Sequence, residues 1–238
     1  LITDEAVRVI EEAPDKPFFL YVAYSVPHFP LDEPEPWLEL YADQFGSESR
    51  QWYAASITHM DAGIGRIINA LDASGMRENT LVVFVNDNGG QKSWHSETLY
   101  EGGIRVPGLA NWPGVLEPRL LAEPIHIVDW MPTLCSMAGC APASELPWDG
   151  RDLWPVIAGR EASIGERTMY WKTPKAYAVR RGPLKLIVDA KRENPELFNV
   201  EEDPREQRDL AAAHPEAVEE LRAVLERIAR DDRSRSAG

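Results

Sequence analysis

Cysteine is scarce in this sequence, and long hydrophobic runs are missing. The 238 residues include 2 cysteines, Cys135 and Cys140, whose spacing forms neither a zinc-binding pattern nor a disulfide framework. The longest apolar run, residues 18–24, is far shorter than the stretch of about 20 residues that crosses a bilayer. The sequence therefore argues against a zinc domain, a disulfide-stabilised domain and insertion into a membrane.

Positive charge is also in short supply. Lys and Arg number 25 against 39 Asp and Glu, and the formal net charge is -14. Proteins that bind nucleic acid present a basic face, so we expect no nucleic acid as a partner, and we expect no docking onto anionic lipid. A small anionic substrate remains compatible, because a bound metal ion and a few local cations can dominate the electrostatics of a pocket.

The sequence opens without a recognisable leader segment. It begins at Leu1 rather than at a methionine and continues almost at once into a predicted helix. We interpret the chain as a fragment or a processed product.

Strand-like and helix-like segments alternate in the first 155 residues. Short apolar runs with the composition of buried strands occupy 16–23, 81–85 and 106–112. Apolar periodicity or end signals predict helices over 3–12, 49–71 and 125–138. This alternation predicts an α/β domain with a layered, largely parallel sheet.

The pattern changes after about residue 155. Turn residues such as Gly182 separate short β-like runs at 168–171, 176–180, 184–188 and 197–200. A last helix is predicted over 215–230, with an apolar side that can cover one face of these strands. We therefore divide the chain into residues 1–155 and a small subdomain, 156–238, made of an antiparallel sheet and a helix.

Asp87, Asn88 and Gly89 form the first candidate site. They follow a predicted strand, and ligands in α/β sheets gather at the carboxyl ends of strands. A carboxylate and an amide oxygen suit Ca²⁺ or Mg²⁺, although two ligands do not complete a site. The alternative is a plain turn, because these residue types favour turns without any ligand.

His28 is the second candidate. It lies between Pro27 and Pro30, just after another predicted strand, so its backbone is constrained. An imidazole there could donate a hydrogen bond to an anion or a proton to a leaving oxygen. The alternative is a histidine packed in a loop. Farther along the chain, Arg105 follows a pair of glycines and could contact an anion or form a structural salt bridge.

Several segments together resemble the sulfatase family of the alkaline-phosphatase-like superfamily, in its C-terminal portion. The matching segments follow the family order: KPFFLYVAYSVPHFP (16–30), ITHMDAGIGRII (57–68), LVVFVNDNGG (81–90), LYEGGIRVP (99–107), IVDWMPTL (127–134), AVRRGPLKLI (178–187) and PELFNVEEDPREQRDL (195–210). Each motif is weak or moderate by itself, and their common order and spacing carry the resemblance. It implies that residues 1–155 are the C-terminal part of a catalytic domain with an alkaline-phosphatase-like fold.

The resemblance implies roles for three residues. Asp87 and Asn88 correspond to the pair that completes a metal site, usually Ca²⁺, and His28 to a histidine that contacts the sulfate and assists the leaving group. The family nucleophile is a formylglycine made from the Cys or Ser of a C/S-x-P-x-R motif, which we expect in a missing N-terminal part. Cys135 lacks the Pro and Arg of that motif, and Cys140 has Ser144 where the Arg belongs.

One position departs from the family pattern. Ser96 occupies the place of a lysine that usually binds sulfate in this family. We hypothesise that the neighbouring His95 takes over part of that role in substrate binding. The alternative is that the loop has diverged and His95 is merely exposed. The change also leaves open a phosphate or phosphonate ester as the substrate.

The expected activity of the whole protein is hydrolysis of a sulfate ester, either a small molecule or a carbohydrate, with Ca²⁺ as the cofactor. The expected partner is the missing N-terminal half, without which this part should be inactive. The competing interpretation is a truncated, non-catalytic relative. Family resemblance favours a periplasmic or extracellular location.

Overall fold

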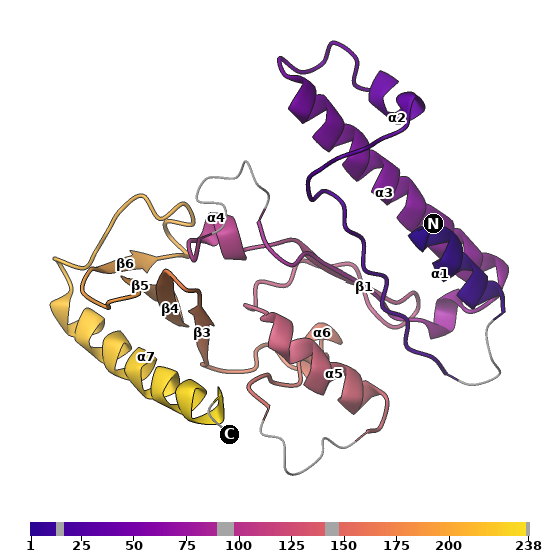
Figure 1. Ribbon diagram of the computed structural model, residues 1–238. Helices are drawn as coiled ribbons and strands as arrows, with labels where there is room; N and C mark the ends of the chain where they lie inside the picture. Colours follow the sequence, from indigo (N-terminus) through magenta and orange to yellow (C-terminus); the bar gives the residue numbers. More distant parts are fainter. Residues whose placement is uncertain (13–16, 90–97, 141–147, 237–238) are drawn as a thin grey trace. The chain divides into compact units, whose positions relative to one another are not determined.

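The computed structural model describes residues 1–12, 17–89, 98–140 and 148–236, with side chains as far as 232. The chain divides into two compact units (Figure 1). The first contains residues 1–82 and 112–115, and the second contains 83–111 and 116–238. Among the described helices, none combines the length and hydropathy needed to span a bilayer.

The first unit is built around a long helix. Its elements are α1 (Ile2–Glu11), α2 (Glu35–Glu39), α3 (Glu48–Ala73) and the short 3₁₀ helix η1 (Arg77–Asn79). Helices α1 and α3 lie side by side in Figure 1, and the buried Ala6 and Ile10 of α1 belong to the core. Gly63 permits close contact, because a Cβ there would lie 2.7 Å from Thr3 Oγ1. The predicted helices at 3–12 and 49–71 are thus confirmed.

The strand predicted at 16–23 is wrong for its described part. Residues 17–23 follow an irregular path, and Phe19 and Tyr21 are 76% and 79% exposed. A strand exists only where its N–H and C=O groups find a partner strand. No strand of the described residues pairs with this segment, so its apolar side chains remain at the surface.

Most of a two-stranded sheet lies at the start of the second unit. The strands β1 (Val82–Val85) and β2 (Gly108–Asn111) pair, close to the predicted strands at 81–85 and 106–112. Neither is fully buried, which differs from the prediction for 81–85. Between them lies α4 (Glu101–Ile104), and after them come η2 (Ile127–Asp129), α5 (Trp130–Met137) and α6 (Trp154–Ile157).

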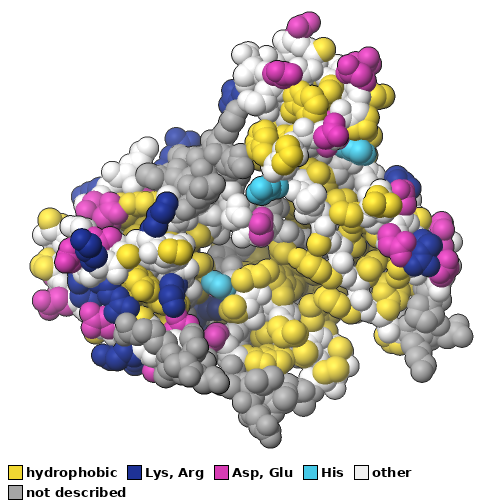
Figure 2. Space-filling model, in the orientation of Figure 1, with side chains coloured by type: hydrophobic (Ala, Val, Ile, Leu, Met, Phe, Trp, Pro, Cys, Tyr) yellow, Lys and Arg dark blue, Asp and Glu magenta, His cyan; other side chains and the backbone are white. Residues whose placement is uncertain are grey.

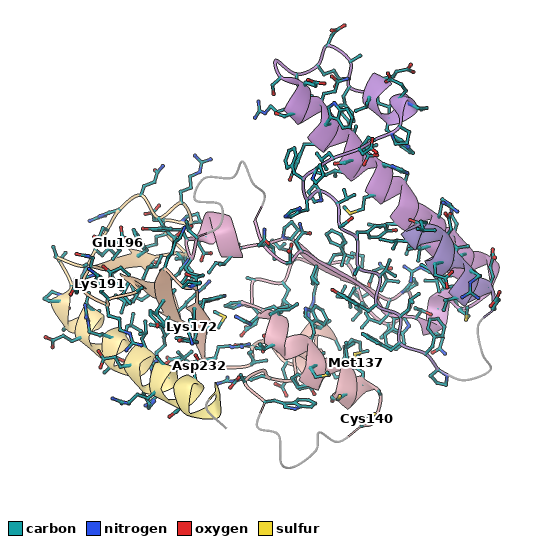
Figure 3. All side chains as sticks on the ribbon, viewed as in Figure 1. Met137, Cys140, Lys172, Lys191, Glu196 and Asp232 are labelled. Carbon is teal, nitrogen blue, oxygen red and sulfur yellow. The ribbon has the colours of Figure 1, made fainter. Side chains whose placement is uncertain are left out.

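The C-terminal region is an antiparallel meander covered by a helix. Its strands are β3 (Thr168–Lys172), β4 (Ala176–Arg181), β5 (Leu184–Asp189) and β6 (Pro195–Asn199), in that spatial order, followed by α7 (Pro215–Ser236). Figure 1 shows α7 along this sheet. Lys172 of β3 and Asp232 of α7 form an ion pair at 2.6 Å (Figure 3). The predicted meander and its covering helix are confirmed.

The meander carries a hydrophobic core on each face. Alternate side chains of β4, β5 and β6 point to opposite sides, as strand geometry requires. On one face, the strand residues Val179, Leu186, Val188 and Leu197 pack against Val218, Leu221, Val224 and Leu225 of α7. On the other face, Ala178, Ile187 and Phe198 pack with Val200 and with Leu99, which lies just before α4. The small sheet is therefore sandwiched between α7 and the chain that leads into α4.

Candidate active site

The turn after β1 carries Asp87 and Asn88. Both side chains are exposed, and Asn88 Nδ2 donates to the carbonyl oxygen of Gly89 at 2.9 Å. Because the amide nitrogen is used in this way, the amide oxygen is the atom left to meet a cation. One carboxylate and one amide oxygen are thus presented together at the end of a strand, in accord with the predicted position.

Gly89 fastens this turn to α4. Its N–H donates to the carbonyl oxygen of Gly103 at 2.8 Å. A Cβ on residue 89 would lie 2.0 Å from the carbonyl oxygen of Gly102, which is far inside van der Waals contact. Only glycine allows the two backbone segments to approach so closely. The position of Asp87 and Asn88 is therefore coupled to the position of α4.

The donor set fits a hard cation but does not complete its coordination. Ca²⁺ takes six to eight oxygen ligands, and Asp87 and Asn88 supply the oxygen types that it prefers. No group of three or more His, Cys, Asp or Glu side chains suited to a metal occurs within the described parts of the chain. Asp87 therefore belongs to no such group within these parts, and a complete site would need further ligands.

His28 has one ring nitrogen engaged. Its side chain is exposed, and Nδ1 lies 2.6 Å from the carbonyl oxygen of Phe29. A carbonyl only accepts, so Nδ1 carries the hydrogen, and Nε2 is left for a substrate. The turn is held by the backbone hydrogen bond from His28 N–H to Ser25 C=O at 2.9 Å. The constrained backbone expected at His28 agrees with this turn, and the role of the ring stays a prediction.

The predicted site residues fall in different parts of the molecule. His28 belongs to the first compact unit, whereas Asp87 and Asn88 belong to the second. The structure brings Asp87 and Asn88 together on one turn. His95 and Ser96 lie outside the described residues. Arg105 is exposed, and its guanidinium lies 3.9 Å from Glu101 Oε2, a long ion pair that agrees with the structural alternative.

Sequence reasoning missed the buried charges behind α4. Lys185 Nζ donates to Glu101 Oε1 at 2.9 Å and lies 2.8 Å from Glu206 Oε1. The available signal was a lysine flanked by apolar residues in the segment LKLIV (184–188). A lysine is almost never fully buried unless it is paired, so such a position calls for carboxylate partners.

Comparisons with known proteins agree with this architecture. A sequence model of the family named Sulfatase matches residues 1–140. The uncharacterised sulfatase YdeN of Escherichia coli K12 is 28% identical, and the match covers 94% of this chain and 49% of that protein. Human arylsulfatase A is 29% identical, covering 88% of this chain and 48% of its own, and human arylsulfatase D is 32% identical, covering 71% and 30%.

Solved structures give the same fold. The crystal structure of Ps i-CgsB in complex with k-i-k-neocarrahexaose superposes with a TM-score of 0.83 at 26% identity, covering 95% of this chain and 53% of that one. The putative sulfatase yidJ from Bacteroides fragilis gives 0.78 at 24% identity, covering 94% and 56%. The predicted α/β, alkaline-phosphatase-like fold is confirmed. The chain spans about half the length of YdeN, arylsulfatase A and these two solved structures, and it belongs to the sulfatase family.

Proposed function

We propose that this chain contributes part of the active site of a Ca²⁺-dependent sulfate ester hydrolase. The observation that carries the proposal is the turn after β1, which presents Asp87 and Asn88 side by side at a strand end. Membership of the sulfatase family and the constrained, exposed His28 support it.

Asp87 and Asn88 would hold the cation through a carboxylate oxygen and an amide oxygen. When bound, such an ion attracts negative charge on the oxygens of the ester group and so stabilises the transition state. The carboxylate of Asp87 would offset part of the positive charge of the ion, and Asn88 would contribute a neutral dipole. Mg²⁺ is the alternative ion, since it accepts the same oxygen donors but requires a tighter octahedral arrangement.

His28 would serve the leaving group. With Nδ1–H donating to the carbonyl oxygen of Phe29, protonation adds a hydrogen at Nε2. The imidazolium can pass this proton to the departing alcohol oxygen, and the neutral ring can then accept a hydrogen bond at the same atom. His95 is proposed as a second contact of the substrate anion, in place of the lysine that Ser96 replaces.

The nucleophile is proposed to come from an N-terminal half of the same protein. The sequence contains no C/S-x-P-x-R motif, and the chain spans about half the length of its relatives. That half would supply a formylglycine and the remaining metal carboxylates. Residues 17–23, which carry exposed apolar side chains, are suited to pair with strands from it.

For the substrate we propose a sulfate ester of a carbohydrate or a small molecule. One similar structure was solved with a neocarrahexaose, which favours a carbohydrate. A phosphate or phosphonate ester is the second candidate, and Ser96 is the observation that favours it. Without a lysine at position 96, a sulfate group would be held differently, while the chemistry of the metal ion would be kept.

The test uses the native polypeptide that carries residues 1–238. Turnover of 4-nitrophenyl sulfate and 4-nitrophenyl phosphate is measured with Ca²⁺ and after chelation. We expect sulfate turnover that requires Ca²⁺, a rise of about tenfold or more in the Ca²⁺ concentration needed by Asp87→Ala and Asn88→Ala, and a fall in kcat of about 10²–10⁴-fold in His28→Ala.

An exposed acidic residue provides the matched control. Glu117→Ala removes a carboxylate from a surface loop of the second unit and should leave turnover unchanged. The proposal is wrong if chelation and Asp87→Ala leave turnover at the wild-type level. Preference for the phosphate ester by more than about tenfold would instead support the second candidate.

A further inference from the structure

The buried lysine of β5 is the starting observation. Lys185 is 0% exposed, in a unit of the molecule that otherwise buries mainly aliphatic and aromatic side chains. An ammonium group that leaves water is strongly disfavoured unless it is paired and hydrogen-bonded. A buried lysine in a strand therefore needs partners, and the structure provides two.

Lys185, Glu101 and Glu206 form a closed triangle of contacts. Lys185 Nζ lies 2.9 Å from Glu101 Oε1 and 2.8 Å from Glu206 Oε1. The other carboxylate oxygen of Glu206 accepts a hydrogen bond from the main-chain N–H of Glu101 at 2.5 Å. Glu101 is thus held through both its side chain and its backbone, at the first residue of α4.

Glu206 is itself held in an unfavourable backbone conformation. Its φ is 54°, in the left-handed region that non-glycine residues rarely occupy. Such a conformation persists where the surrounding contacts determine it, and it is enriched at functional positions. The carboxylate contacts, with Lys185 and with the N–H of Glu101, are among those that hold Glu206 in place.

A second set of contacts fixes the segment before α4 on the same face of the sheet. Leu99 is buried in the cluster that contains Ile187 and Phe198. The ring of Tyr100 meets that of Phe198 edge-on, with centroids 5.8 Å apart, and its hydroxyl donates to Glu196. Residues 99–101 are thereby attached to β5 and β6 by apolar, aromatic and ionic contacts.

The far end of α4 touches the turn that carries the candidate metal ligands. Gly103 accepts the N–H of Gly89 at 2.8 Å, and no side chain fits between residues 89 and 102. A continuous path therefore leads from the small sheet to the turn: from Lys185 and Glu206 to Glu101, along one turn of α4 to Gly103, and across to Gly89. Every member of this path belongs to the second compact unit.

We propose that Lys185 and Glu206 are positioning residues, which fix α4 and through Gly103 and Gly89 set the conformation in which Asp87 and Asn88 meet the cation. The C-terminal subdomain would then be a structural requirement for metal binding, although it contributes no ligand among the described residues. This inference rests on the proposed metal site. The link between the small sheet and the turn can nevertheless be measured without any metal.

The test compares Lys185→Met and Glu206→Gln in the native polypeptide. Glu206→Gln is the milder change, because the amide oxygen can still accept the N–H of Glu101 while the negative charge is lost. The first readout is hydrogen exchange of the Gly89 amide without metal, which we expect to become about tenfold faster or more. The second is the Kd for Ca²⁺ by calorimetry, which we expect to rise by about 10–100-fold.

Val188→Ala is the matched control. It lies on the same strand as Lys185, is buried, and faces α7 instead of α4. We expect it to lower the melting temperature while Gly89 exchange and the Kd for Ca²⁺ stay at wild-type values. A purely structural role of Lys185 would make Val188→Ala behave like Lys185→Met.

Each outcome decides the inference. It is overturned if Gly89 exchange is unchanged in Glu206→Gln and in Lys185→Met, or if Val188→Ala accelerates it as much. If Lys185→Met does not fold, Glu206→Gln alone decides. A wild-type protein that binds no Ca²⁺ would refute the proposed metal site, and Gly89 exchange would still show whether the small sheet fixes the turn.

Discussion

Arg167 forms a bidentate ion pair with Asp129: its Nη1 donates to Oδ2 at 2.7 Å and its Nη2 donates to Oδ1 at 2.9 Å. Asp129 is 0% exposed and also accepts the backbone N–H groups of His126 and Arg151. The bond to His126 is part of a capping box at the start of η2, whereas the side chain of Asp129 makes no capping bond to α5. The same carboxylate in addition joins the start of α5 to the residue that precedes β3.

Asp129→Asn should be strongly destabilising. Each carboxylate oxygen faces two N–H donors, so an amide NH₂ group at either position would point at a donor. Breaking a buried pair by removing one charge typically lowers the free energy of unfolding by about 3–5 kcal/mol. Urea unfolding of the native polypeptide measures it. Glu5→Gln, in the exposed pair with Arg8, is the control and should have no measurable effect; equal losses in the two variants would contradict the prediction.

Gly89→Ala should weaken Ca²⁺ binding by about tenfold or more. The new Cβ would meet the carbonyl oxygen of Gly102 at 2.0 Å, so the turn of Asp87 and Asn88 must move away from α4. Gly65→Ala is the control, because its Cβ meets nothing within 4 Å on helix α3. It should keep the wild-type Kd and raise stability by about 0.5–1 kcal/mol. Calorimetry and thermal unfolding test both variants, and unchanged binding by Gly89→Ala would refute the coupling.

The buried ring of His126 should make stability depend on pH. Burial lowers the pKa of His126 below its usual 6.5; Asp129 opposes this effect and Arg167 adds to it. The unfolded chain then takes up the proton first as the pH falls. The stabilisation is complete above about pH 6.5 and is lost progressively below it, towards the folded-state pKa.

His126→Phe should remove the part of the pH-dependent stability that His126 contributes. The melting temperatures of wild type and variant are compared at about pH 7.5 and about pH 5.5, and the decrease on acidification should be smaller in the variant. Burial raises the pKa of Glu206 and acts in the opposite sense, so the difference between the two proteins is the informative quantity. His214→Gln, an exposed position, is the control. Identical decreases in wild type and His126→Phe would contradict the prediction.

Purified residues 1–238 should expose apolar surface. Figure 2 shows broad areas of hydrophobic side chains on the face that it draws, and Phe19, Tyr21 and Leu120 are 76%, 79% and 97% exposed. Such patches bind hydrophobic dyes and promote association. We expect ANS fluorescence and concentration-dependent oligomers, both reduced in Phe19→Ser/Tyr21→Ser. A monomer that melts cooperatively and binds no ANS would contradict this.

Local pattern predicted most of the elements. The apolar spacing of 49–71 and the turn at Gly182, which has a φ of 54°, identified α3 and the meander, because these features depend on residues close in the sequence. The segment 16–23 was predicted as a strand from its apolar composition alone. Composition does not specify a hydrogen-bonding partner, and the described residues 17–23 have none in a sheet.

The sequence allowed the candidate ligands to be predicted, but not the buried contacts that hold their turn in place. Residue type and position after a predicted strand identify Asp87 and Asn88 as candidate ligands. The contacts behind them join residues far apart in the sequence: 84 positions separate Lys185 from Glu101, and 105 separate Glu206 from Glu101. Nothing in a single sequence pairs such residues, although an isolated lysine in an apolar strand indicates that partners exist.

The two-faced packing of the meander has a consequence for folding. A shift of β5 by one residue against β4 and β6 would turn every side chain to the opposite face. Most positions would tolerate the exchange, since aliphatic residues occupy both sides. Lys185 would not, because its ammonium would then enter the apolar cluster under α7, far from Glu101 and Glu206. One charged residue thereby distinguishes the correct strand alignment from its nearest competitor.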